Sequence, residues 1–281
     1  MAEINITEME AAYQRTKGLI HNTPIMTSEQ INKITGKTVY FKCDHLQKTG
    51  SFKARGALNS VLLAKEESTQ GVVTHSSGNH GQALAWAAGN AGLNSVINTC
   101  DKLARGTGFR IVEPSNCVTM INGHSSIAFE LVEQLDGKID SVFLAIGGGG
   151  LAASVVYCLA HLRPDIRVFL AEPESKNLQK QLNDGIRCEK DMLDTVADGV
   201  RVAHVGSLCR PILEKYSSNN IISVTENEIR EALIILWTRL KQRVEPTAAL
   251  AFAPLLFHCP PGVENAAVIL CGGNVDANFI P

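Results

Sequence analysis

The alternation of apolar runs with helix-like segments constrains the fold of this 281-residue chain most strongly. Apolar, strand-like runs occupy residues 38–43, 71–75, 141–146, 166–171, 220–224 and 266–271. Segments with helical periodicity follow Ser51 and occupy residues 79–91, 150–163, 174–184 and 226–243, the last with Thr225 as its N-cap. Such alternation is typical of parallel sheets covered by helices. We therefore predict an α/β fold.

This pattern weakens between Ser95 and Gly123. Only short apolar pieces occur there, at 95–98, 109–112 and 117–121, and no helix is predicted between them. A crossover between parallel strands needs about a dozen residues or more. The pattern alone therefore does not show how parallel strands in this region would be connected.

The charge composition excludes some partners. Lys and Arg (26) nearly balance Asp and Glu (28), so the net charge of -2 creates no field that would attract nucleic acid or a membrane surface. The first residues are acidic where a secretion signal is basic, and no later stretch is long and apolar enough for a membrane span, so we expect a cytoplasmic protein. The eight cysteines form no C-x-x-C pair, which favours free thiols.

A run of four glycines, Gly147, Gly148, Gly149 and Gly150, follows the strand-like run 141–146 and precedes a helix. Glycines at such a turn let main-chain N–H groups close around a phosphate at the positive end of the helix. The same turn also fits the dinucleotide pattern G-x-G-x-x-A, with Glu172 at the end of the next strand. Taken alone, the turn leaves a nicotinamide-dependent dehydrogenase open as an alternative.

Three further polar segments lie at predicted strand or helix ends. Ser76, Ser77, Asn79 and His80 begin a helix, where hydroxyl, amide and free N–H groups suit a carboxylate. Lys53 lies in a Ser-Phe-Lys helix entry, where a lysine is usually solvated. The last segment, 271–274, is a strand end that opens into a glycine turn. In parallel sheets, ligands bind at such strand ends.

Together these segments resemble the fold-type II pyridoxal-phosphate (PLP) enzymes, most closely the serine racemase and serine/threonine dehydratase group. The resemblance covers nearly the whole chain, through residues 21–28, 41–59, 72–84, 147–150, 197–200, 245–248 and 271–276. It implies a tryptophan synthase β-like fold of two parallel-sheet α/β lobes with the cofactor in the cleft. The small lobe would span residues 72–122, and residues 1–71 and 123–281 would form the large lobe.

The resemblance also implies roles for individual residues. Lys53 would form the Schiff base with PLP and abstract the Cα proton, and Ser77 would donate a proton on the opposite face. Ser76, Ser77, Asn79 and His80 would bind the substrate carboxylate. Cys271 would be a neutral partner of the pyridine nitrogen, which disfavours transamination. The implied cofactor-binding residues are Lys53, Asn79, Gly147, Gly148, Gly149, Gly150, Gly199, Glu245 and Cys271. The implied activities are racemisation of serine and elimination of ammonia from serine and threonine.

Two departures from the family pattern bear on activity. The region after Ser95 is shorter than in the family by roughly thirty residues, and the missing piece carries a substrate-side arginine there. A catalytically impaired or inactive PLP-binding paralogue is therefore the alternative. The divalent cation site retains Glu172, but Leu178 occupies the expected Asp position and Lys176 lies between them. Because Mg²⁺ needs several oxygen ligands, we expect weak or absent metal binding.

Two further properties follow from the resemblance alone. Residues of the family's ATP site persist in part as Lys48, Thr49, Gln82 and Lys241, so activation by a nucleotide is a further expectation. A homodimer is usual in the family, and we expect one here.

Overall fold

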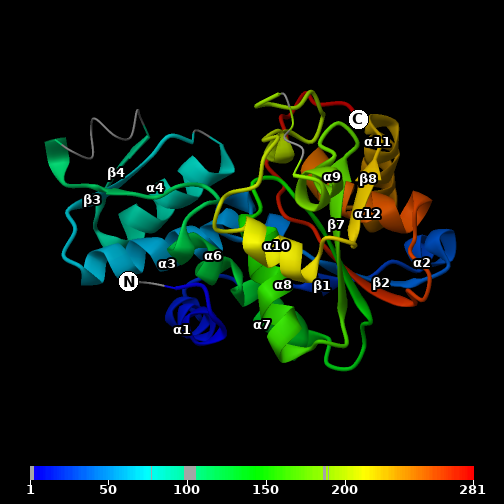
Figure 1. Cartoon of the computed structure of the whole chain (residues 1–281), viewed down its shortest axis with the longest axis horizontal. Helices are drawn as coiled ribbons and strands as arrows, with labels where there is room; N and C mark the ends of the chain where they lie inside the picture. The colour runs from blue at the N-terminus through cyan, green and yellow to red at the C-terminus, as the bar shows by residue number, and fades with distance from the viewer. Residues whose placement is uncertain (1–2, 77, 98–105, 186–187, 189) are drawn as a thin grey trace.

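A computed structural model describes residues 3–76, 78–97, 106–185, 188 and 190–281, and its strands form two sheets (Figure 1). The larger sheet has the strand order β1-β2-β9-β6-β7-β8, and only β1 runs antiparallel to its neighbour. Its strands are β1 (Ile25–Met26), β2 (Thr38–Lys42), β6 (Ser141–Ala145), β7 (Arg167–Pro173), β8 (Ile221–Val224) and β9 (Asn265–Ile269).

The smaller sheet lies at the other end of the molecule and has the order β4-β3-β5 (Figure 1). Its strands, β3 (Gly71–Thr74), β4 (Asn94–Ile97) and β5 (Arg110–Ile111), are all parallel. The predicted α/β class with two parallel-sheet units is confirmed. The division into lobes at residues 72 and 122 stays a prediction.

Helices pack on both sheets, and none within the described ranges is long and apolar enough to cross a membrane. The α-helices are α1 (Ile6–Thr16), α2 (Glu29–Thr35), α3 (Lys53–Glu66), α4 (Asn79–Ala91), α6 (Val118–His124), α7 (Ser126–Gln134), α8 (Gly150–Leu162), α9 (Leu178–Asn183), α10 (Arg210–Tyr216), α11 (Glu226–Ile235) and α12 (Pro246–Phe257). Short helical turns are η1 (Asp44–Leu46), η2 (Lys48–Gly50), η3 (Asp198–Val200) and the π-turn η4 (Leu236–Leu240).

The helix predicted at 226–243 begins where expected. Thr225 forms a capping box with Glu228, in which each side chain accepts a hydrogen bond from the other residue's main-chain N–H. The helix continues through η4 and ends at Leu240, because Lys241 adopts a left-handed conformation with φ of 61°. The predicted end was three residues too late.

Two apolar cores correspond to the two sheets. The larger core surrounds the six-stranded sheet. The smaller core joins β3, α4 and α3, with Val72, Leu84, Leu58 and Val61 among its buried residues. Helix α3, whose first residue is Lys53, therefore packs with the smaller core.

The region between Ser95 and Gly123 contains a helix that the sequence pattern did not predict. Residues Val118–His124 form α6, which packs against α3 and α8 and buries Met120 and Ile121. Tertiary burial outweighs the weak helical preference of this short segment. On the outer strands of the smaller sheet, Ile97 and Ile111 are 47% and 36% exposed, so the described residues leave these apolar side chains uncovered.

Candidate active site

A cavity of about 410 Å³ lies at the start of α3, α4 and α8 and at the end of β9. This volume is within the ~300–1,000 Å³ of small-molecule sites. Its lining comprises Phe52, Lys53, Ser76, Gly78, Asn79, His80, Gln82, Pro114, Ser115, Ala145, Gly147, Gly148, Gly149, Gly150, Leu151, Ala152, Asp198, Gly199, Val200, Val202, Glu245, Thr247, Cys271 and Asn274.

Lys53 places its amine in this cavity from the first residue of α3. Its Nζ donates a hydrogen bond of 2.5 Å to the Pro114 carbonyl oxygen and lies 5.0 Å from the centroid of the Phe52 ring. Burial lowers the pKa of Lys53 to about 8. With such a pKa, about a tenth of the amine is neutral at pH 7 and about half is neutral at pH 8, and the neutral form is the one that acts as a nucleophile or general base.

The two thiols near Lys53 do not raise its pKa, because both are neutral. Cys271 and Cys209 would raise the pKa of Lys53 if they were ionised. Burial raises the pKa of Cys209 to about 12, and burial followed by the negative charge of Glu245 raises the pKa of Cys271 well above its usual value. Both thiols are therefore neutral at physiological pH, and the neutral state predicted for Cys271 is compatible with its surroundings.

The four glycines form a tight loop at the start of α8. Gly149 caps the helix with φ of 95°, a left-handed conformation that other residues rarely adopt. A Cβ on Gly148 would lie 2.3 Å from Ser115 Oγ, and one on Gly150 would lie 2.8 Å from the Ser115 carbonyl oxygen. Side chains are thus excluded, and the loop presents main-chain N–H groups at the positive end of α8, an arrangement that suits a phosphate.

Asn79, Glu245 and Asn274 form a hydrogen-bonded group at the cavity wall. The Asn79 side-chain amide donates to both Glu245 carboxylate oxygens, at 2.9 and 3.2 Å. Asn274 donates through Nδ2 to Asn79 Oδ1 at 2.7 Å and through its main-chain N–H to Glu245 Oε1 at 2.9 Å. Burial raises the pKa of Glu245, and the two asparagine donors oppose that rise. The Asn79 side chain is thereby fixed in one orientation.

His80 is almost fully buried, and its ring cannot donate to a substrate carboxylate in this arrangement. The Nε2 atom lies 2.9 Å from the Val112 carbonyl oxygen, which can only accept, so Nε2 carries the hydrogen. Burial and the nearby Lys53 lower the pKa of His80 to about 3, so the ring is neutral and Nδ1 has only a lone pair. The main-chain N–H of His80 is available instead, because the first N–H groups of α4 have no partner within the helix.

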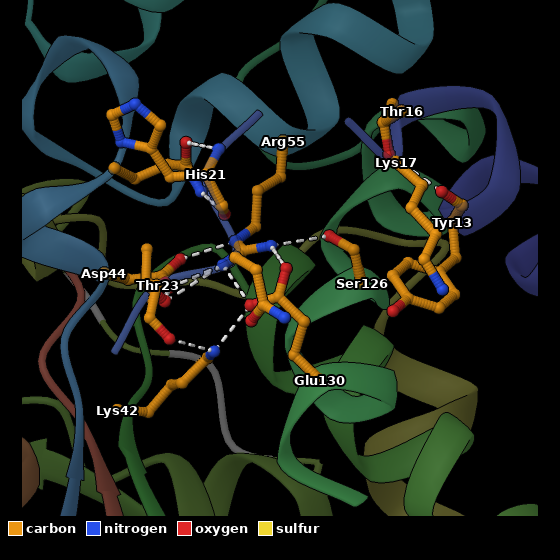
Figure 2. Close-up of polar contacts among 12 residues, drawn as sticks. Tyr13, Thr16, Lys17, His21, Thr23, Lys42, Asp44, Arg55, Ser126 and Glu130 are labelled. Atoms are coloured by element: carbon orange, nitrogen blue, oxygen red, sulfur yellow. Dashed lines mark hydrogen bonds and ion pairs between the residues drawn. The ribbon is translucent and has the colours of Figure 1, made fainter. Parts of the chain in front are cut away.

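A buried network of charges anchors α3 two residues after Lys53 (Figure 2). The Arg55 guanidinium lies between the Asp44 and Glu130 carboxylates and donates two hydrogen bonds to each, at 2.6 to 2.9 Å. Lys42 Nζ donates to Glu130 Oε2, which also accepts from Arg55, and to the Thr23 carbonyl oxygen. Although burial opposes ionisation, Arg55 lowers the pKa of Asp44. Two positive and two negative charges therefore balance away from solvent.

Most of the predicted site residues line one cavity, while some lie elsewhere. The cavity gathers Lys53, Ser76, Asn79, His80, Gln82, Gly147, Gly148, Gly149, Gly150, Gly199, Glu245 and Cys271. Ser77 lies outside the described residues. Lys48, Thr49, Lys241 and Glu172 do not line the cavity, so of the four predicted nucleotide contacts only Gln82 does. The nucleotide site stays a prediction without support from this geometry.

Several lining residues were not predicted from the sequence. Pro114 and Ser115 contact Lys53 and the glycine loop from a segment with no recognisable motif. Thr247 Oγ1 accepts a hydrogen bond of 3.0 Å from the Gly199 N–H. Asn274 ends the glycine turn 271–274 and Thr247 lies in the segment 245–248 of the family resemblance, so both had a signal in the sequence.

The half-present cation site does not fit a divalent metal. Glu172 is fully buried, and both of its oxygens are used, by the Leu178 N–H at 2.7 Å and the Ser223 hydroxyl at 2.9 Å. Leu178 offers no side-chain oxygen, and the Lys176 ammonium is buried beside Glu172. Among the described residues, no group of three or more His, Cys, Asp or Glu side chains could hold a metal. The buried Glu172 is also unavailable to a ribose, which removes the support for a dinucleotide site.

Comparison with known proteins identifies similar chains. The chain matches the family described as pyridoxal-phosphate dependent enzyme over residues 16–102 and 95–272. It is 34% identical to the serine racemase of Dictyostelium discoideum, over 100% of this chain and 98% of that protein. Among solved structures, it is similar to a pyridoxal 5'-phosphate-dependent aspartate racemase (TM-score 0.92, 33% identity, 100% and 99% coverage). It is also similar to a threonine deaminase from T.th. (TM-score 0.90, 36% identity, 99% and 100% coverage).

The alignments also bear on the abbreviated region. The two family matches overlap at residues 95–102, within the stretch that is shorter than in the family. The alignment with the Dictyostelium protein runs over 319 positions, 38 more than the 281 residues of this chain. The match nevertheless extends over nearly the full length of both proteins. On these grounds, the chain belongs to the family of pyridoxal-phosphate dependent enzymes.

Proposed function

We propose that this protein is a PLP-dependent serine racemase that also eliminates ammonia from serine and threonine. The observation that carries the proposal is the position of Lys53. Its amine, with a pKa of about 8, faces a cavity that also contains a glycine phosphate loop. The serine racemase and threonine deaminase relatives support the choice of small amino acids as substrates.

The residues of the cavity fit the cofactor. The loop 147–150 is the cradle for its phosphate, where any Cβ at Gly148 or Gly150 would clash with Ser115. Lys53 would hold the cofactor covalently, Asn79 would contact its ring hydroxyl, and the neutral Cys271 thiol would face its ring nitrogen. When bound, the cofactor draws electrons from the Cα of an attached amino acid and so makes the Cα proton acidic.

Two proton-transfer groups are needed for racemisation, one on each face of the Cα atom. Lys53 takes the proton from one face, since its neutral amine is a base near physiological pH. We propose the Ser77 hydroxyl for the other face, on the family resemblance. Elimination needs proton abstraction on the Lys53 side only, and the substrate hydroxyl takes up a proton and leaves as water.

We propose that the substrate carboxylate binds at the start of α4. Ser76 offers a hydroxyl there, and the first N–H groups of the helix, including that of His80, are donors. The positive end of the helix dipole favours the same charge. The His80 ring then serves to fix this turn, through its hydrogen bond to Val112.

The rate at which apoprotein attaches PLP to Lys53 should rise with pH and level off above a midpoint near pH 8. Only the neutral amine attacks, and an amine is neutral above its pKa, so the rate should fall about tenfold per unit below that midpoint. The measurement is the initial rate at which the visible band of attached cofactor appears, followed from about pH 6 to about pH 10. A rate that keeps rising to the range of an ordinary lysine, near 10.4, would contradict the lowered pKa.

Turnover tests the proposed function. Holoprotein is incubated with L-serine, D-serine is measured by chiral chromatography, and pyruvate is measured with lactate dehydrogenase. We expect both products. The abbreviated region favours a second candidate, an impaired PLP-binding paralogue, and cofactor attachment without either product would support that candidate. A homodimer, a cytoplasmic location and nucleotide activation stay predictions.

A further inference from the structure

Lys176 is a fully buried lysine behind the wall of the cavity, and it does not line the cavity itself. Its Nζ donates to two main-chain carbonyl oxygens, that of Gly147 at 3.0 Å and that of Val202 at 2.6 Å. Gly147 begins the glycine loop, and Val202 ends the wall segment 198–202, which includes η3. Both of these residues line the cavity, so one ammonium bridges two parts of its wall.

The surroundings of this ammonium are rich in oxygen. Two of its three donors are used by the carbonyl groups. Burial lowers the pKa of Lys176 to about 8 and the charge of Glu172 opposes that fall, so the amine is mainly protonated at neutral pH. Main-chain carbonyl oxygens are also among the ligands that metal cations take in proteins, and here two of them contact one positive charge while the Glu172 carboxylate lies nearby without a direct contact. The lysine thus supplies from the chain the charge that a bound ion would supply.

The position of Lys176 is itself fixed by neighbouring contacts. Its main-chain N–H donates to the Pro173 carbonyl oxygen at 2.9 Å, and its carbonyl oxygen accepts from Gln181 Nε2 at 2.7 Å. Gln181 also donates to the Ala203 carbonyl oxygen at 3.2 Å, just beyond the wall segment. These hydrogen bonds fix the main chain of Lys176 and so keep its ammonium in contact with the two carbonyl groups.

The wall segment lies close to the glycine loop at this point. A Cβ on Gly147 would lie 3.1 Å from the Gly199 carbonyl oxygen and 3.2 Å from the Val200 Cα atom. Without the ammonium, the Gly147 and Val202 carbonyl groups would lose the hydrogen-bond donor that they share, which favours a shift of the two segments apart. Such a shift would move the first main-chain N–H groups of the glycine loop, which are the proposed phosphate ligands.

We propose that Lys176 is a positioning residue whose ammonium acts as an internal cation, joining the glycine loop to the wall segment 198–202 so that PLP binds without an added metal ion. This inference deepens the proposed function, because it rests on PLP binding in the same cavity. It also explains why the divalent cation site is only half present.

The test measures the dissociation constant of PLP by quenching of tryptophan fluorescence, in a buffer whose only cation is tetramethylammonium. The wild-type protein should bind PLP equally, within about twofold, with or without EDTA, K⁺ or Mg²⁺. Lys176→Ala should bind about tenfold more weakly or worse. Adding about 100 mM methylammonium or K⁺ should restore most of that loss, because either ion can enter the oxygen-lined space left by the side chain.

Two further variants separate charge from folding. Lys176→Met fills the space with an apolar side chain, so it should bind weakly and show no rescue. Lys180→Ala removes an exposed lysine from the neighbouring α9 and should bind as the wild type does.

The inference would be wrong if the wild-type protein needed an added cation to bind PLP. It would also be wrong if Lys176→Ala bound PLP as tightly as the wild type, or if folded Lys176→Ala bound PLP weakly and no added cation restored its affinity. The wild-type result stands even if the variants fail to fold. A wild-type protein that does not bind PLP under any of these conditions would instead contradict the proposed function.

Discussion

Lys53→Ala should lower turnover of L-serine by about a thousandfold or more, because it removes both the covalent attachment of PLP and the base for the Cα proton. The variant should still bind PLP, since the glycine loop, Asn79 and Cys271 remain in the cavity. The measurement is the rate of pyruvate and D-serine formation at saturating PLP, together with the release of the cofactor when the protein is denatured.

Lys65→Ala is the matched control for this variant. Lys65 is an exposed lysine near the other end of the same helix, α3, so its removal should leave turnover within about twofold. Turnover by Lys53→Ala close to that of the control would show that the base lies elsewhere.

Arg55→Met should lower the free energy of unfolding by about 3–5 kcal/mol. Arg55 is completely buried, and its removal leaves Asp44 without its ion-pair partner and Glu130 paired with Lys42 alone among the described residues (Figure 2). An uncompensated buried charge costs much more than a lost surface pair. The measurement is urea denaturation followed by circular dichroism, with linear extrapolation to water.

Arg163→Met is the matched control, because Arg163 also contacts two carboxylates, Asp136 and Asp165, but at the surface. We expect Arg163→Met to lower the free energy of unfolding by about 1 kcal/mol or less. Equal effects of the two variants would contradict the view that the buried network anchors the helix of Lys53.

The regular part of the fold was predictable from the sequence, because local signals determine it. The apolar runs became strands, and the capping box at Thr225 marked the start of α11. Helix α6 was not predictable in the same way. Its seven residues form a helix because Met120 and Ile121 are buried against elements that lie far away in the sequence.

In the candidate site, too, some residues are predictable from local motifs and others only from tertiary contacts. Lys53 and the four glycines lie in motifs that sequence reasoning can find. Pro114 and Ser115 carry no motif, and they reach the cavity only because the chain folds back over α3 and α8. The partner of the His80 ring, the Val112 carbonyl oxygen, is likewise invisible in the sequence, and it changes what that ring can donate.

Buried charges were the hardest feature to foresee. Arg55 pairs with Asp44, 11 residues away, and with Glu130, 75 residues away. In the sequence, Lys176 only indicates that the cation site is incomplete. In the structure, its ammonium contacts two carbonyl groups of the cavity wall. Only the tertiary arrangement shows which charges compensate each other.

The attachment of PLP to Lys53 can be tested with the absorbance spectrum of the purified protein with PLP, before and after L-serine, followed by borohydride reduction and peptide mapping. We expect a visible band that changes when serine is added, with the reduced cofactor on the peptide that contains Lys53. A protein without such a band, or with the cofactor attached to a different lysine, would contradict this attachment.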